Sequence, residues 1–385
     1  MLKGPATGEE PLSLLANEPI GPLDRTPYST APRAAFAYEA LAYRVVFGEG
    51  TLARAADEAD RLGIKRALVL TTPQQHADGS RLGRVLGHRL AAEFAEAAMH
   101  TPIAVTERAM GVIEARDIDG LIALGGGSAV GLAKALSLRS GLPQLVLPTT
   151  YAGSEMTPIL GETRDGIKTT QRRRDIVPDT VIYDVDLTMS LPAAISATSG
   201  LNAMAHAVEA LYAPEANPVI SLMAEEGIAA LGRALPRIVA TPSDRDARSD
   251  ALHGAWLCGT CLGAVSMSLH HKLCHVLGGS FDLPHAETHA IVLPHVVAYN
   301  AGAAPQAMRR IARALGTPDA AHGIFGLQRR LNVSLALADI GMPEDGIDLA
   351  AELATRNAYA NPRSVDRAAL RELLSRAWRG EAPLS

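Results

Sequence analysis

The stretch "LIALGGGSAVGLAKAL", residues 121–136, decides the fold of the first half of this chain. Its apolar run, three glycines and helical spacing predict a buried strand that turns directly into a helix. Gly125, Gly126 and Gly127 let a ligand approach the backbone, and the first N–H groups of the new helix point towards it. This arrangement stabilises a pyrophosphate. Taken alone, the motif equally allows a tight turn capped by Ser128.

A second loop favours the ligand. The stretch "LPTTYAGSEMT", residues 147–157, follows the next expected strand and offers the hydroxyl groups of Thr149, Thr150 and Ser154. Both loops would leave a parallel sheet at its carboxyl edge, which is where ligands bind. The two loops together therefore favour a dinucleotide cofactor.

The kind of dinucleotide depends on a third strand end, "LTTPQQ" at residues 70–75. If this loop holds the adenosine ribose, the discriminating residue is Thr72. A threonine accommodates a 2′-phosphate that an acidic side chain would repel, so we expect either NADH or NADPH. The glycine turn departs from the usual dinucleotide fingerprint, which needs glycine where Val130 stands, and no Walker sequence follows it.

Strands and helices alternate over residues 36–190, which predicts an α/β dinucleotide-binding domain with a mostly parallel sheet. From 191 to 385 the spacing is helical only, and we expect an all-helical catalytic domain. Residues 1–35 are rich in proline and are expected to form an extended or disordered arm. Expected strands are 43–47, 66–72, 103–105, 120–128 (running into the glycine turn) and 142–150. Expected helices are 52–63, 80–97, 106–116, one ending at 139, 191–213, 219–239, 246–264, 304–315, 320–331 and 366–379.

Composition limits which kinds of partner the protein can bind and indicates the cell compartment in which it acts. A net charge of −5, with 48% hydrophobic and 20% charged residues, is typical of a globular enzyme and predicts neither a nucleic-acid nor a membrane partner. No long apolar window or signal-peptide pattern is present. Three cysteines cannot build a disulfide framework, which favours the cytoplasm. We interpret the C-x-x-C pair Cys258 and Cys261 as a small-residue helix face rather than a redox or zinc site.

Histidines gather in "LHHKLCHVLGGSFDLPHAETH", residues 269–289. His271 and His275 are four residues apart and share one helix face, while His285 follows a proline at an expected turn. A single histidine would most simply be a hydrogen-bonded core residue. A cluster of this density favours an active site.

A helix upstream carries a matching pair, Asn202 and His206. Imidazoles at positions 206, 271 and 285 with a carboxylate at 202 would form a divalent-metal site. Position 202 holds an amide, which is a much poorer ligand. The pattern therefore indicates a metal site that has lost its anionic ligand.

Four ordered motifs make the chain resemble the iron-containing alcohol dehydrogenase superfamily, and within it the maleylacetate reductase branch. They are "GGGS" through the lysine that follows it (125–134), "PTTYAGSEMTP" (148–158), "TSGLNAMAHAVEALYAP" (198–214) and "LHHKLCHVLGGSFDLPHAETHAIVLPH" (269–295). The resemblance covers about residues 36–380. It implies a dinucleotide-binding α/β domain, a helical domain, a cleft between them and a homodimer.

By position, the resemblance puts Asn202, His206, His271 and His285 at the superfamily's four metal-ligand places and His275 near the nicotinamide. Asparagine at 202 replaces the usual aspartate. Glycine replaces the aspartate common at position 131 as well. Both departures are shared by the maleylacetate reductase branch, so the resemblance implies that no divalent metal is required.

The implied activity is the NAD(P)H-dependent reduction of the C=C bond of maleylacetate to 3-oxoadipate, in the catabolism of aromatic compounds. The substrate is a small dicarboxylate whose alkene is conjugated to a ketone. Hydride addition β to the ketone places negative charge on the ketone oxygen, which fixed donors stabilise. His206, His271 and His285 are the candidates for polarising the substrate, and one of them or His275 for protonating the adjacent carbon.

Three other functions stay open at this point. A metal-dependent alcohol dehydrogenase would lose its activity in chelator and regain it with Fe²⁺ or Zn²⁺. A lyase resembling dehydroquinate synthase would use NAD catalytically and consume no net NADH. An inactive homologue would act only as a binding module.

Overall fold

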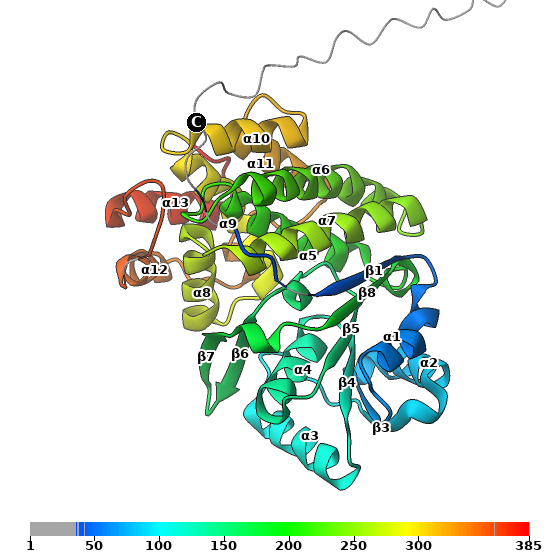
Figure 1. Cartoon of the computed structure of the whole chain (residues 1–385). Helices are drawn as coiled ribbons and strands as arrows, with labels where there is room; N and C mark the ends of the chain where they lie inside the picture. Colours follow the sequence, from blue (N-terminus) through cyan, green and yellow to red (C-terminus); the bar gives the residue numbers. More distant parts are fainter. Residues whose placement is uncertain (1–35, 37, 42, 358, 385) are drawn as a thin grey trace, which may run out of the picture. The chain divides into compact units, whose positions relative to one another are not determined.

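Six parallel strands form a sheet in the order β1-β8-β5-β4-β2-β3 (Figure 1). The computed structural model describes residues 36, 38–41, 43–357 and 359–384. The expected arm, 1–35, lies outside the described residues, and residues 37–385 group into one unit. The strands are β1 (Arg44–Gly48), β2 (Ala67–Leu70), β3 (Leu90–Phe94), β4 (Gly120–Gly125), β5 (Gln144–Pro148) and β8 (Thr180–Asp184).

Helices cover both faces of the sheet because successive side chains of a strand point to opposite sides. Leu68 and Leu70 of β2 pack with Val105 and Leu132 on one face. Val69, between them, packs with Leu82 on the other. The strands are therefore apolar on both faces, as a doubly covered parallel sheet requires. The helices are α1 (Ala55–Arg61) and α2 (His76–Leu86) on the Val69 face and α3 (Ile103–Ala115) and α4 (Gly127–Ser140) on the opposite face.

Two expected elements were wrong. The segment 80–97, expected as one helix, is the end of α2 followed by strand β3. The segment 103–105, expected as a strand, is the first turn of α3, which begins directly after Pro102 at its N-cap. In β3 the sequence "LAAEF" has no β-branched residue, and its pairing with β2 overrides that weak strand preference.

A two-stranded antiparallel hairpin, not expected from the sequence, lies outside the main sheet. Its strands are β6 (Ile159–Arg164) and β7 (Ile167–Arg172), and the turn between them contains Asp165 and Gly166 at positive φ. An Asp-Gly turn of this kind is a hairpin signal. Strand β8 was likewise missing from the expected strands.

Among the described residues beyond 193, the long elements are all helical, as expected. Their cores form two clusters, one built mainly on α5, α6 and α7 and one on α8, α9, α12 and α13. The change from strands to helices lies between β8 and α5, where the expected domain boundary at residue 190 falls. Residues 37–385 group into one unit, so this domain boundary stays a prediction. The helices are α5 (Ala193–Ala210), α6 (Pro218–Ala240), α7 (Arg245–Ala264), α8 (Leu269–Phe281), α9 (His285–Asn300), α10 (Pro305–Leu315), α11 (Ala320–Arg330), α12 (Gly346–Thr355) and α13 (Arg367–Arg379).

Within the described part of the chain, no single helix is long and apolar enough to cross a membrane. The bent pair α7 and α8, at 94°, passes that test by length and composition only.

The C-x-x-C pair lies on α7 as a packing surface. Cys258 and Cys261 are buried free thiols, and burial raises the pKa of Cys261 to about 12. A Cβ on Gly227 of α6 would lie 2.7 Å from the sulfur of Cys258. The thiols therefore fill the space between two closely approaching helices, which agrees with the expected helix face.

The loop after β5 touches the helical part through two glycines. Gly153 has φ 76° and lies against Gly259 of α7, where an added Cβ would come within 2.8 Å of the Gly153 carbonyl oxygen. Only glycine satisfies both the left-handed backbone and this approach. The contact holds the loop after β5 against α7.

Gly259→Ala is therefore expected to lower the free energy of unfolding by about 1–3 kcal/mol through overpacking. Gly326→Ala is the matched control, because Gly326 also lies in a helix and has nothing within 4 Å of an added Cβ. The control is expected to be neutral or stabilising by up to ~1 kcal/mol. Urea unfolding of both variants measures this, and equal stabilities would contradict the contact.

Candidate active site

The glycine turn between β4 and α4 brings three strand ends together. Gly125 has φ 153°, and a Cβ there would lie 2.5 Å from Oε1 of Gln75. A Cβ on Gly126 would lie 2.9 Å from the methyl group of Thr150, whereas Gly127 has nothing within 4 Å. The first two glycines are needed for packing between loops, and the third leaves open space at the start of α4. That open space is the place where a phosphate can approach the helix N-terminus.

Gln75 connects the loops and was missed by the sequence analysis. Its Nε2 donates to Oγ1 of Thr149 at 2.5 Å, and the hydroxyl of Thr72 donates to its Oε1 at 3.2 Å. The backbone N–H of Thr149 also donates to the carbonyl of Gly125 at 3.2 Å. The residues expected at the cofactor thus lie at or just after the ends of the neighbouring strands β2, β4 and β5: Thr72, the three glycines, Ser128, Thr149 and Thr150.

Ser154 is held in place by a buried lysine on α4. The ammonium of Lys134 donates to the carbonyl oxygens of Ser154 at 2.6 Å, Thr157 at 2.7 Å and Ile159 at 3.1 Å. Burial lowers the pKa of Lys134 to about 7. The lysine therefore ties α4 to the chain that enters the hairpin and fixes where Ser154 lies.

The expected histidines come from three helices. His206 on α5 and His271 on α8 are buried, with ring centroids 5.2 Å apart. His275, one turn further along α8, is exposed, with its ring centroid 6.4 Å from that of His271. His285, the first residue of α9, is exposed as well. Buried and solvent-facing imidazoles therefore meet at the junction of these helices. Asn202 lies one turn before His206 on α5 and is 5% exposed.

A buried carboxylate that sequence analysis missed organises this junction. Glu209 of α5 accepts from Nδ1 of His271 at 2.7 Å and from the backbone N–H groups of Ser268 and His270, each at 2.8 Å. Because an ionised carboxylate only accepts, Nδ1 of His271 carries the proton and Nε2 keeps its lone pair. This lone pair is buried and has no partner among the described residues.

The buried imidazoles are neutral at neutral pH. Burial lowers the pKa of His206 well below its usual range, and the neighbouring His271, His270 and His285 lower it further. Burial also lowers the pKa of His271, as do His275 and His285. These buried rings are therefore suited to hydrogen bonding rather than to serving as fixed cations.

Two family models cover most of the chain. The model described as "Iron-containing alcohol dehydrogenase" matches residues 42–185, and "Fe-containing alcohol dehydrogenase family, C-terminal" matches residues 196–378. The chain belongs to the iron-containing alcohol dehydrogenase family. The resemblance inferred from the four motifs and the expected fold class are thereby confirmed.

Among members of this family, the chain is 54% identical to a maleylacetate reductase of Sphingobium indicum over 91% of this chain and 99% of that protein. The crystal structure of maleylacetate reductase from Agrobacterium tumefaciens is 53% identical and superposes with a TM-score of 0.89, covering 91% of this chain and all of that one. A sulfoacetaldehyde reductase from Bifidobacterium kashiwanohense, solved with NAD⁺, shares the fold at 22% identity and a TM-score of 0.83, with 90% and 99% covered.

The family's name implies iron, and the four family positions do not fit it well here. Asn202 supplies a neutral oxygen, and the other three positions are imidazoles, so no carboxylate would face a divalent cation directly. In the described part of the chain, the ligand atoms that converge closely belong to His270, His271 and His289, without His206 or His285. The donor set of the family site therefore lacks an anionic ligand.

Sequence reasoning found both residues of the pairs on α5 and α8 but only the first residue of the pair on α9. His289 lies four residues after His285 on α9, at the same spacing as the pairs on α5 and α8, and this spacing was the available signal. No local signal identifies Glu209, whose partners are about sixty residues away.

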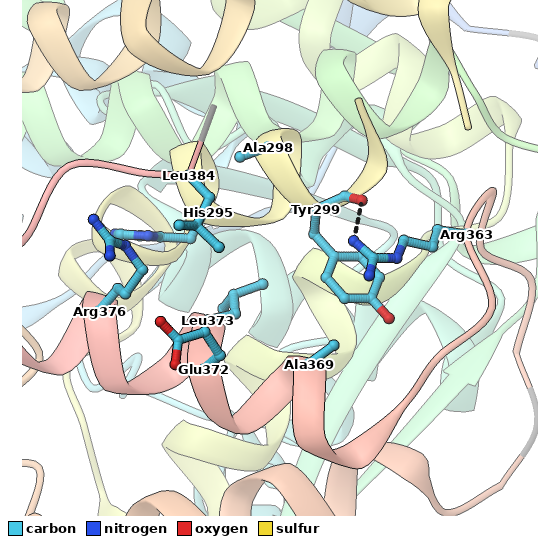
Figure 2. A pocket seen from close by; sticks show the side chains of 9 residues that line it. All are labelled: His295, Ala298, Tyr299, Arg363, Ala369, Glu372, Leu373, Arg376 and Leu384. Atoms are coloured by element: carbon cyan, nitrogen blue, oxygen red, sulfur yellow. Dashed lines mark hydrogen bonds between the residues drawn. The ribbon is translucent and has the colours of Figure 1, made fainter. Parts of the chain in front are cut away.

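A cavity between α9 and α13 contains none of the expected site residues (Figure 2). Arg363 stacks on Tyr299 there at 4.2 Å and donates to its carbonyl oxygen. His295, also in the wall, is only 3% exposed. Burial lowers the pKa of His295 to about 4, with a further contribution from Arg376.

His295 therefore makes stability depend on pH. Its folded pKa of about 4 lies below the value of 6.5 for an exposed histidine, so the unfolded chain takes up the proton first as pH falls. We expect wild type to lose about 3 kcal/mol relative to His295→Gln between pH 6.5 and 4. Urea unfolding across this range measures the difference, and parallel pH curves for the two proteins would contradict it.

Proposed function

We propose that this chain is a maleylacetate reductase, which reduces the C=C bond of maleylacetate to give 3-oxoadipate with NADH or NADPH. The observation that carries the proposal is 54% identity to maleylacetate reductases over 91% of the chain. The neutral pocket around Asn202 supports it, because a buried amide is a poorer metal ligand than a carboxylate.

The cofactor would supply the hydride, and the chain's own residues would receive the charge that develops on the ketone oxygen. A neutral imidazole can donate to that oxygen through a ring N–H. His206 and His285 are suited to this role. His271 is not, since its proton is committed to Glu209 and Nε2 can only accept. His271 therefore positions the substrate or a water molecule, and the exposed His275 is the candidate proton donor.

We further propose that this chemistry needs no divalent metal at the four family positions. Oxidation of NADH with freshly prepared maleylacetate, with and without EDTA, tests both statements. Rapid oxidation that EDTA leaves unchanged is the expected result. Activity on aldehydes that collapses in EDTA and returns with Fe²⁺ or Zn²⁺ would favour the metal-dependent dehydrogenase. Turnover of a substrate without net loss of NADH would favour the lyase. No turnover of any kind would favour the inactive binding module.

His285→Ala is expected to lower kcat at least ~100-fold, because a donor to the developing negative charge is lost. Its free energy of unfolding should stay within about 0.5 kcal/mol of wild type, since the side chain is exposed. His88→Ala, another exposed histidine, is the matched control and should keep full activity. Steady-state kinetics and urea unfolding give both readouts; a variant with normal kcat would remove His285 from the mechanism.

Thr72 is expected to let both cofactors work. Thr72→Asp should lower kcat/KM for NADPH at least ~10-fold while changing that for NADH by less than ~3-fold, because the carboxylate repels a 2′-phosphate. Thr72→Ser is the control and should change neither value greatly. If Thr72→Asp affects the two cofactors equally, the ribose lies elsewhere.

We also propose a homodimer, as family membership suggests, in the cytoplasm, where three free cysteines would stay reduced. Light scattering of the purified protein measures the mass of the assembly. A monomer at micromolar concentration would contradict the proposed dimer.

A further inference from the structure

Three imidazoles face one another, and one of them, His271, is also one of the four family positions. His270 and His289 are 0% and 1% exposed, and His271 is 7% exposed. Their ring centroids are 4.9, 5.0 and 5.2 Å apart, and the ring planes meet at 77–79°. We call these three residues the inner triad. The near-equal distances and near-perpendicular planes describe three rings arranged around a common point.

A metal ion bound by imidazoles produces these spacings. Imidazole nitrogen binds Zn²⁺ at about 2.0–2.1 Å, which puts each ring centroid ~3.2 Å from the ion and two centroids ~5.2 Å apart at a tetrahedral angle. One ligand atom from each of His270, His271 and His289 lies within 4.8 Å of the other two. Small rotations of the rings would close the remaining distance.

Unpartnered nitrogens are the second observation. Nδ1 of His270, Nε2 of His271 and both ring nitrogens of His289 are buried and have no hydrogen-bond partner among the described residues. A buried polar atom that nothing satisfies is unfavourable. Neutral imidazole lone pairs are what a transition metal binds.

Hydrogen bonds through their second ring nitrogen already orient His270 and His271. Nδ1 of His271 donates to the carboxylate of Glu209 at 2.7 Å, and Nε2 of His270 lies 2.9 Å from the carbonyl oxygen of His289. In each ring the opposite nitrogen is therefore left with its lone pair. Metal-binding histidines show this pattern, in which a carboxylate or carbonyl holds the second nitrogen.

We propose that His270, His271 and His289 bind one borderline divalent transition-metal ion, of the class of Zn²⁺ or Co²⁺. The all-nitrogen donor set selects this class over Mg²⁺ or Ca²⁺, which require oxygen ligands. The site shares only His271 with the family's four positions. An ion held there would take the lone pair on Nε2 of His271 in place of the substrate or water contact proposed for it, and it leaves the roles proposed for His206, His275 and His285 unchanged.

Cobalt is the probe for the test, because Co²⁺ in a nitrogen site gives a visible absorption that reports its coordination. Full-length protein is treated with chelator, dialysed and titrated with Co²⁺, and bound metal is counted by elemental analysis. We expect one ion per chain. His289→Gln should weaken binding at least ~100-fold, whereas His285→Gln, four residues away on the same helix, should change it by less than ~3-fold.

Loss of a buried imidazole can also disturb folding, so circular dichroism accompanies each variant. Glu209→Gln gives a second readout, since loss of the residue behind a ligand is expected to weaken binding about 10–100-fold without removing a ligand. Two results would overturn the proposal. One is wild-type protein that binds no Co²⁺. The other is binding that His285→Gln or Asn202→Ala abolishes while His289→Gln leaves it intact, which would put the ion at the family positions.

Discussion

The carboxylate of Glu209 is the constraint on which the site depends. It lies on α5, is fully buried, and accepts from two backbone N–H groups at the start of α8 and from His271. A buried charge of this kind is tolerated only when its oxygens are satisfied, and burial still raises its pKa. The hydrogen bonds therefore lock the beginning of α8 against α5. They also decide which nitrogen of His271 faces the other imidazoles.

Close contacts also fix the loop after β5, at the carboxyl edge of the sheet. Gly153 and Gly259 bring the loop after β5 against α7, and Lys134 holds the following segment through three carbonyl oxygens. The loops that are suited to a dinucleotide are thus fixed by contacts with helices on two sides. Neither set of contacts requires a ligand, so the loops are pre-organised before a cofactor arrives.

Local patterns were enough for most of the fold. Helices such as α6 and α13 were predicted within one or two residues, because their apolar spacing is regular and proline or glycine marks their ends. The sequence "LAAEF" of β3 carries no such pattern. It is a strand because it pairs with its neighbour β2. Charge and hydrogen bonding across long sequence distances were invisible for the same reason, which is why the contacts of Glu209, Lys134 and Gln75 appear only in the structure.

The order of the strands also bears on how the chain acquires its fold. Strand β1 occupies one edge and pairs only with β8, so Arg44 finds its partner at Thr180. The centre of the sheet, β2 with β4 and β4 with β5, is made from segments much closer in sequence. Closing the longer loop costs more chain entropy and slows the step that depends on it. During synthesis on a ribosome, β1 would thus be made first among the strands and yet wait until residue 184 has emerged before it can join the sheet.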